Sequence, residues 1–240
     1  MQPNEKEGRP PHPLDSLREL GAGLDLLRGL ASAAKARLSP GRDVGHGARV
    51  AVLPGYGMDD ATTLLLRRCL DHHGFKAEGW GLGRNTGAVP DLARRFAERL
   101  SHRVAAFATP YALVGWSLGG YIAREVARSR PDLVARVVTL GSPVKGGPKH
   151  TVLAPLFKAR GFDFERAEER MAAREEVPLQ VPVTAIYSRR DGIVGWRACL
   201  SPEEKMVTHV EVTTSHSGMG FAPEVLDLVV RSLAGGTETP

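Results

Sequence analysis

The alternation of apolar and polar positions divides most of this chain into strand-like and helix-like segments that follow one another in turn. Short runs that are apolar nearly throughout predict strands at residues 48–53, 75–78, 112–114, 133–140, 182–187 and 208–212. Segments with apolar residues on one face predict helices at residues 60–70, 89–100, 118–129 and 223–233. Such alternation is typical of a parallel sheet covered on both faces. The sequence therefore predicts an α/β fold, with a doubly wound and mostly parallel sheet of about six strands.

Residues 14–38 predict one long amphipathic helix, which forms an N-terminal extension over residues 14–42 together with the turn that follows it. Its apolar positions recur at intervals of three and four residues, at Leu17, Leu20, Leu24, Leu27, Ala31, Ala34 and Leu38. Gly21, Gly23 and Gly29 weaken this helix by up to about 1 kcal/mol each relative to alanine. An apolar stripe needs a partner, and we expect the flank of the same domain to bury it. A peripheral membrane contact and a dimer contact through helix 14–38 stay open as alternatives.

The remaining sequence divides into a tail, a main domain and an insert. Residues 1–13 are charged and rich in proline, and we expect them to form a disordered tail. Residues 43–235 form the main domain. Residues 143–178 break the alternation of strands and helices, and we expect them to form a small cap insert over the functional site.

Composition narrows the class of protein. With 240 residues, 42% hydrophobic and 25% charged, the chain resembles one ordinary globular domain. The net charge of +5 comes from scattered basic residues, so no nucleic-acid partner is expected. The polar first residues lack the apolar core of a signal peptide, and no apolar run is long enough to span a membrane, so a cytoplasmic location is expected. Cys69 and Cys199 follow no disulfide or metal-ligand pattern. Whether they pair stays open, and neither a metal nor a cofactor is predicted.

The most informative motif is G-x-S-x-G at residues 115–119. A predicted strand precedes it and a predicted helix follows it, which is the context that this motif requires. A serine on such a turn holds its Oγ out of the sheet, and the two glycines avoid clashes with neighbouring backbone. The N-terminus of the helix also favours the negative charge that acyl transfer generates. Ser117 is therefore predicted to be a nucleophile.

Two further residues complete a candidate catalytic triad. Asp191 follows the strand predicted at residues 182–187, and ligands of doubly wound sheets bind at the carboxyl ends of strands. A carboxylate there accepts a hydrogen bond from an imidazole and fixes its tautomer. Of the eight histidines, His216 is the one in a loop of small residues directly after the last predicted strand. We predict Asp191 as the acid and His216 as the base, against the plainer alternatives of a turn aspartate and a surface histidine.

The turn after the first predicted strand supplies a candidate oxyanion hole. The sequence there is Pro54-Gly55-Tyr56, and the backbone amide of Tyr56 is predicted to act together with that of Leu118. A plain Pro-Gly turn is the alternative. Apolar side chains near these positions are expected to contact substrate. The predicted substrate-binding residues are Trp116, Val144 and Met219.

On these residues the chain resembles the α/β-hydrolase superfamily over about residues 48–235. Segments 140–143 and 191–194 are similar to those of bacterial esterases and lipases related to the triacylglycerol lipases and the inositol-deacylase-type hydrolases. Segment 115–120 is similar to the elbow of the methyl esterase of biotin synthesis. The resemblance implies the same nucleophile, acid, base and oxyanion donors. Many relatives have His-Gly at Pro54-Gly55, so we expect other contacts to hold this turn, and the two antiparallel strands that often open the fold have no counterpart.

The sequence therefore predicts a serine hydrolase that cleaves carboxylic esters with short-to-medium acyl groups through a Ser-His-Asp triad and an acyl-enzyme. Its expected partner is a small-molecule or lipid-like ester substrate. An acyltransferase, thioesterase or amidase would use the same triad, because acceptor choice depends on pocket shape. A non-catalytic binding protein with a hydrolase fold is the alternative from a different class.

Overall fold

The computed structural model describes residues 10–36 and 43–235. At its centre is one sheet of six parallel strands in the order β2-β1-β3-β4-β5-β6. The strands are β1 (Arg49–Leu53), β2 (Lys76–Gly79), β3 (Tyr111–Trp116), β4 (Val134–Leu140), β5 (Val183–Ser188) and β6 (Val207–Val212). The predicted fold is confirmed, and each strand begins and ends within two residues of its predicted limits.

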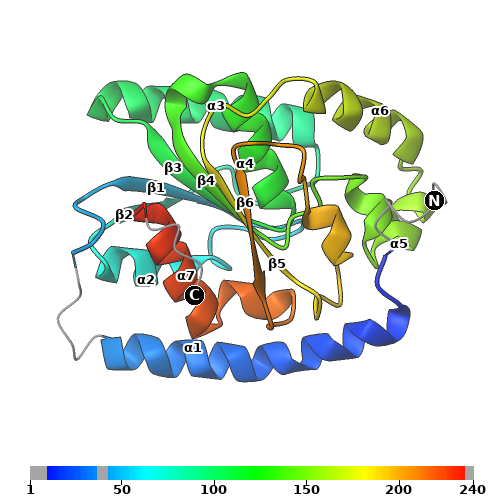
Figure 1. Cartoon of the computed structure of the whole chain (residues 1–240), viewed down its shortest axis with the longest axis horizontal. Helices are drawn as coiled ribbons and strands as arrows, with labels where there is room; N and C mark the ends of the chain where they lie inside the picture. The colour runs from blue at the N-terminus through cyan, green and yellow to red at the C-terminus, as the bar shows by residue number, and fades with distance from the viewer. Residues whose placement is uncertain (1–9, 37–42, 236–240) are drawn as a thin grey trace.

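Helices cover both faces of this sheet (Figure 1). The α-helices are α1 (Ala22–Ala36), α2 (Leu64–His72), α3 (Val89–Phe107), α4 (Leu118–Ser129), α5 (Ala154–Ala159), α6 (Phe164–Glu175) and α7 (Pro223–Leu233). The 3-10 helices are η2 (Pro13–Gly21), η3 (Pro131–Leu133), η4 (Gly147–His150), η5 (Trp196–Cys199) and η6 (Ser217–Gly220). Helices α3 and α4 pack on one face, and α2 and α7 on the other. In the described ranges, no helix is long and apolar enough to cross a membrane.

The pleat of the central strands divides the core between the two faces of the sheet. In β1, Ala51 and Leu53 join the apolar cluster beneath α3 and α4, whereas Val50 and Val52 join the cluster beneath α2 and α7. Because successive side chains of a strand point to opposite faces, a strand buried on both sides must be apolar throughout. This explains why the central strands read as continuous apolar runs.

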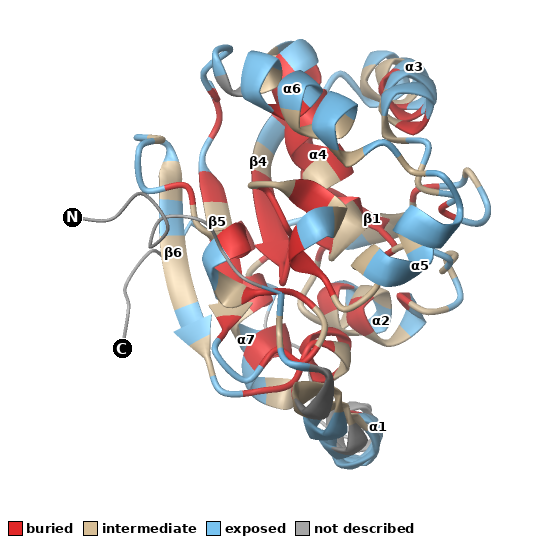
Figure 2. Ribbon diagram, turned by 90° about the vertical axis from the view of Figure 1, so that its right-hand side faces the viewer, coloured by how far each residue is buried: buried red, intermediate tan, exposed pale blue. Residues whose placement is uncertain are grey.

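The N-terminal extension differs from the helix that its sequence predicts. A 3-10 helix over Pro13–Gly21 precedes α1, so the predicted single helix is divided where Gly21 and Gly23 weaken it. The expectation that the leucine stripe is buried is wrong, since Leu17, Leu24 and Leu27 are 62 to 65% exposed. Figure 2 shows α1 at the edge of the molecule with much of its surface exposed. Leu38 and most of the predicted tail lie outside the described residues.

The opposite face of this extension packs against the domain, and it carries polar residues and a glycine. A Cβ at Gly29 would lie 2.3 Å from the backbone oxygen of Phe221, so this position of α1 approaches the domain closely. The carboxylate of Asp25 accepts a hydrogen bond from Thr214 Oγ1 at 2.8 Å. Hydrogen bonds and a close backbone approach therefore determine how the extension docks, rather than burial of its leucines.

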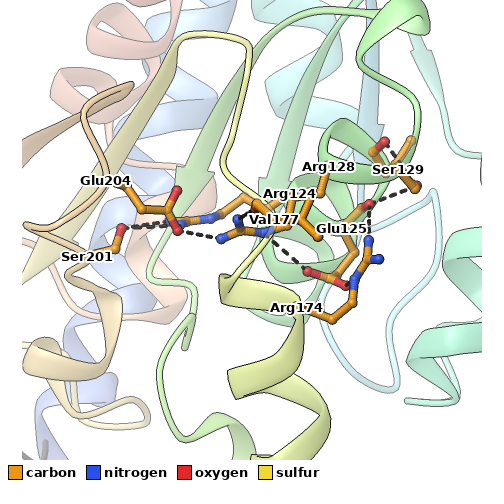
Figure 3. A network of polar contacts seen from close by, with 9 residues as sticks. Arg124, Glu125, Arg128, Ser129, Arg174, Val177, Ser201 and Glu204 are labelled. Carbon is orange, nitrogen blue, oxygen red and sulfur yellow. Dashed lines mark hydrogen bonds and ion pairs between the residues drawn. The ribbon is translucent and has the colours of Figure 1, made fainter.

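Within the segment 143–178, predicted as a cap, the structure contains η4, α5 and α6. A network of charges that is buried except at Arg174 connects α6 to the rest of the molecule (Figure 3). Arg174 on α6 pairs with Glu125 on α4 at 2.7 Å, and Glu125 also contacts Arg128. Arg124 and Arg128, both buried on α4, share the carboxylate of Glu204 from the connection between β5 and β6. One network thus joins three parts of the fold that are far apart in sequence.

Candidate active site

Ser117 lies on the sharp turn between β3 and α4, in a backbone conformation that residues other than glycine rarely adopt. Its φ is 54° and its ψ is −123°. The neighbouring glycines leave no room for a side chain, because a Cβ at Gly115 would lie 2.3 Å from the Cα of Gly120. A Cβ at Gly119 would lie equally close to the carbonyl oxygen of Leu53. This is the geometry that the motif predicts for an exposed nucleophile.

Asp191 and His216 form a buried pair in the loops that follow β5 and β6. His216 Nδ1 lies 2.6 Å from Asp191 Oδ2, and both side chains are almost fully buried. The other oxygen of Asp191 accepts hydrogen bonds from the backbone amides of Ile193, at 2.9 Å, and Val194, at 2.7 Å. These two amides fix the orientation of the carboxylate, which in turn orients the imidazole.

The pair determines the proton affinity of the imidazole. Burial lowers the pKa of His216, but the negative charge of Asp191 and its hydrogen bond outweigh burial, so the pKa of His216 lies above its ordinary value of 6.5. The charge of Glu19 acts in the same direction. A histidine in this environment is a strong proton acceptor, as a general base must be.

The strand-to-helix turn and the buried pair lie in one region. The amide of Ser117 donates to the carbonyl of Leu140 at 2.7 Å. At the next residue, Gly141, a Cβ would lie 2.9 Å from His216 Nδ1 and 3.0 Å from Asp191 Oδ2. The indole Nε1 of Trp116 donates to the carbonyl of His216 at 3.2 Å. The segment around Ser117 therefore packs directly against the His216 loop.

The turn after β1 lies beside the serine. A Cβ at Gly55 would lie 3.4 Å from the Cβ of Ser117. Among the described residues, the backbone amides of Tyr56 and Leu118 have no hydrogen-bond acceptor. These two amides are the donors that the sequence predicts for an oxyanion hole.

Asn85 is a site residue that sequence reasoning missed. It is fully buried, and its Nδ2 donates to the carbonyl of Pro54 at 2.9 Å. Its backbone carbonyl accepts from the amide of Gly57, and its backbone amide donates to Met58. Asn85 thus holds the turn at Pro54-Gly55 in place, as expected where this chain lacks the more common His-Gly. The only signal in the sequence is an asparagine within a loop rich in glycine.

Glu19 is the second site residue that the sequence did not reveal. From η2, its carboxylate accepts hydrogen bonds from the backbone amides of Gly192 at 2.9 Å, His216 at 3.0 Å and Ser217 at 2.8 Å. Burial opposes its ionisation, but these amides, together with the side chain of Ser217, hold the pKa of Glu19 below its ordinary value. One carboxylate therefore ties together the two loops that carry Asp191 and His216.

A cavity of about 880 Å³ lies between the cap segment and the domain. Its walls are mostly apolar, and they include Tyr56, Leu118, Tyr121, Phe157, Phe162 and Met171. The ring of Tyr56 packs edge-on against Phe157 of α5, with 5.0 Å between their centroids. Charged side chains of α3 and α6, among them Arg94 and Arg174, also line the cavity. The two residues predicted for the oxyanion hole thus line this largely apolar cavity.

The residues predicted to contact substrate lie elsewhere. Trp116, Val144 and Met219 are at most 4% exposed, and none of them lines the cavity. Met219 is part of the core, and the indole of Trp116 packs against Phe221. Side chains of the cap segment line the cavity instead, and single-sequence patterns did not show which of them face inward.

The two cysteines form no disulfide and belong to no metal site. Cys69 and Cys199 are unpaired. Burial and the charge of Asp227 raise the pKa of Cys69 to about 11, and burial together with the charge of Asp191 raises that of Cys199. In the described part of the chain, no group of three or more histidine, cysteine or acidic residues forms a metal site.

Comparison with known proteins agrees with this fold. Residues 69–190, about half of the chain, match the alpha/beta hydrolase fold family. The chain belongs to the alpha/beta hydrolase fold family.

Among curated relatives, the chain is 32% identical over 143 residues to a pimeloyl-[acyl-carrier protein] methyl ester esterase of Klebsiella pneumoniae, which covers 54% of this chain and 53% of the relative. The chain thus matches about half the length of such relatives. Among solved structures, it resembles a monoacylglycerol lipase of Paleococcus ferrophilus (TM-score 0.61, 16% identity, 80% and 97% of the two chains). It also resembles the lipase BlEst2 of Bacillus licheniformis (TM-score 0.64, 13% identity, 78% and 92%).

Proposed function

We propose that this protein is a serine hydrolase of carboxylic esters, with Ser117 as nucleophile, His216 as general base and Asp191 as its orienting acid. The observation that supports this most is the strained backbone of Ser117 beside a buried histidine–aspartate pair. A φ of 54° at a serine costs free energy, and such strain is typically found where function requires it.

The proposed reaction proceeds in two halves. His216 accepts the proton of Ser117 Oγ while that oxygen attacks the ester carbonyl, and Asp191 stabilises the imidazolium that forms. The amides of Tyr56 and Leu118 donate to the oxyanion. The protonated His216 then donates its proton to the departing alcohol, which leaves an acyl-enzyme. Water, deprotonated by His216, releases the acid and restores Ser117.

The cavity supports an apolar acyl group as the substrate moiety. It lies beside Tyr56 and Leu118, and its aromatic walls from the cap suit an uncharged acyl chain of short-to-medium length. The curated relatives are named for cleavage of a methyl ester, which supports ester hydrolysis as the reaction class. Acyl transfer to another acceptor, or cleavage of a thioester or amide, would begin with the same acyl-enzyme step. Product partition between water and added alcohol distinguishes transfer from hydrolysis.

We infer that Glu19 is a positioning residue for this reaction. It does not lie among the reacting groups, but its carboxylate accepts hydrogen bonds from the amide of the base itself and from the residue after the acid. These hydrogen bonds hold the loops of Asp191 and His216 in a fixed position relative to each other.

The first test uses the Ser117→Ala variant. We expect a fluorophosphonate probe to label the wild type only, and turnover of p-nitrophenyl esters from acetate to palmitate to fall by about 10⁴-fold or more. Ser101→Ala, at a partly exposed serine of α3, is the matched control and should keep both labelling and turnover. An unlabelled wild type would favour the binding-protein alternative. Turnover of more than about one per cent in Ser117→Ala would refute the nucleophile.

A further inference from the structure

The cavity runs along three helices, and each of them starts near the proposed reacting groups. Leu118 is the first residue of α4 and directly follows the proposed nucleophile. Just before α3, a Cβ at Gly87 would lie 3.0 Å from the ring of Tyr56. Just before α6, the ring centroid of Phe162 lies 5.6 Å from that of Phe157, which itself packs against Tyr56. Position along each helix therefore corresponds to distance from the reacting groups.

The walls of the cavity change from apolar to charged in the same direction on all three helices. On α4, the lining residues recur at intervals of three and four and therefore form one face of the helix. They are Leu118, Tyr121, Glu125 and Ser129. The wall on α3 begins with Val89 and ends with Glu98, and the wall from the cap begins its last stretch with Phe162 and ends with Arg174. An apolar group is thus favoured near the nucleophile and disfavoured further along.

The ion pair of Glu125 and Arg174 crosses this cavity. Arg174 Nε on α6 lies 2.7 Å from Glu125 Oε2 on α4, and its Nη2 donates to the backbone carbonyl of the same glutamate at 3.4 Å (Figure 3). Both residues line the cavity, one from the domain and one from the cap. Arg128 contacts the other carboxylate oxygen of Glu125 at 3.6 Å, so two guanidinium groups hold this carboxylate in place. The pair therefore separates the apolar part of the cavity from its charged part.

Helix α4 allows the length of the apolar part to be estimated. Glu125 stands seven residues after Leu118, which corresponds to about 10 Å along an α-helix. An extended carbon chain, with bonds of about 1.5 Å and angles of about 111°, advances about 1.25 Å per bond. An acyl group of about eight carbons thus reaches from Ser117 to the ion pair. A longer chain must separate Arg174 from a largely buried carboxylate, and it gains little because the walls beyond are polar.

We propose that the Glu125–Arg174 pair sets the upper limit of acyl length at about eight carbons. This inference rests on the proposed function, because it concerns the acyl group that binds next to Ser117. Esters of butyrate and octanoate fit in front of the pair, whereas an ester of palmitate does not. Two residues outside the reacting groups thereby determine which esters are substrates.

The experiment compares kcat/KM for p-nitrophenyl butyrate, octanoate and palmitate in one buffer that contains detergent. We expect the wild type to favour octanoate over palmitate by at least about tenfold. Arg174→Ala removes the half of the barrier that the cap supplies, so the ratio of palmitate to octanoate turnover should rise by at least about tenfold. Arg166→Ala, at an exposed arginine of α6 that does not line the cavity, is the matched control and should keep the wild-type ratio.

Ala93→Leu provides an independent variant that leaves the ion pair in place. Ala93 lies on α3 about one turn after Val89, and it lines the apolar part of the cavity. The larger side chain should fill space that an octanoyl chain needs and a butyryl chain does not. The ratio of octanoate to butyrate turnover should therefore fall by at least about tenfold.

Three results would overturn the proposal. They are equal turnover of palmitate and octanoate by the wild type, an unchanged ratio in an Arg174→Ala variant that circular dichroism shows to be folded, and an unchanged ratio in Ala93→Leu. Labelling by the fluorophosphonate probe in the same samples distinguishes these results from failure of the proposed function. If that function is wrong, the wild type is neither labelled nor active on any of the three esters, and the proposed limit is then wrong as well.

Discussion

At the scale of single residues, the site depends on positions where backbone geometry leaves little choice of side chain. Ser117 adopts a positive φ, at a cost of about 1–3 kcal/mol, and Gly141 leaves space for the His216–Asp191 pair behind it. Sequence patterns predicted Ser117 because the motif encodes this strained turn. They did not predict Asn85 or Glu19, whose roles arise from contacts between distant segments.

The environment of His216 leads to a prediction about pH. Only neutral His216 can accept a proton, so kcat/KM should rise with pH through a pKa that lies above 6.5. In Asp191→Asn the negative charge is lost while burial stays, so this acidic limb should move to lower pH. The rate at the optimum should fall by about 10⁴-fold.

The measurement is kcat/KM for a soluble ester from mildly acidic to mildly alkaline pH. Glu211→Gln, which removes an exposed carboxylate that pairs with Arg189, is the control and should leave the limb in place. An acidic limb that does not shift in Asp191→Asn would show that another group controls it.

At the scale of elements, the N-terminal extension shows where pattern recognition reaches its limit. The spacing of leucines predicted a helix and an apolar face correctly, but it carries no information about which face meets the domain. The carboxylates of Glu19 and Asp25 and the close approach of Gly29 determine which face meets the domain. In the sequence, these residues are indistinguishable from ordinary polar and helix-weakening positions. The strands were predictable because both of their faces are buried. Such a strand must be apolar throughout, and the sequence shows this directly.

A substitution in η2 tests whether this extension supports catalysis. Glu19→Gln removes the charge that accepts from His216, Ser217 and Gly192, and the two loops should lose alignment. We expect kcat to fall by about tenfold to a hundredfold with little change in KM, and the pKa of the acidic limb to fall because a negative charge near His216 is lost.

Asp15→Asn, a carboxylate in the same 3-10 helix that contacts His12 and Arg18 instead, provides the control and should retain full activity. A Glu19→Gln enzyme that loses thermal stability but keeps its kcat and pH profile would show that Glu19 has a structural role only.

At the scale of the whole molecule, the charge network connects the cap, the helix that follows Ser117 and the connection before β6 (Figure 3). Glu204 is its centre, because it pairs with both Arg124 and Arg128. Removing one member of a buried ion pair leaves a buried charge without a counter-charge. The free energy lost in this way is larger than the net contribution of the pair itself.

We therefore expect Glu204→Gln to lower the free energy of unfolding by about 3–5 kcal/mol. Glu203→Gln, whose exposed carboxylate pairs with Lys145 on the surface, should lower it by no more than about 1 kcal/mol. Urea denaturation of both variants provides the comparison, and equal values would show that the network contributes no more than a surface ion pair.

The hydrogen bond between Glu19 and His216 spans 197 positions of the chain, and this separation has a consequence for synthesis. At translation rates of roughly 5–20 residues per second, the carboxylate leaves the ribosome roughly 10–40 s before the amide that it binds. Contacts so distant in sequence are among the slowest to close. The nascent chain therefore holds its first segment undocked until the His216 loop has been made, and the site is completed only after that point.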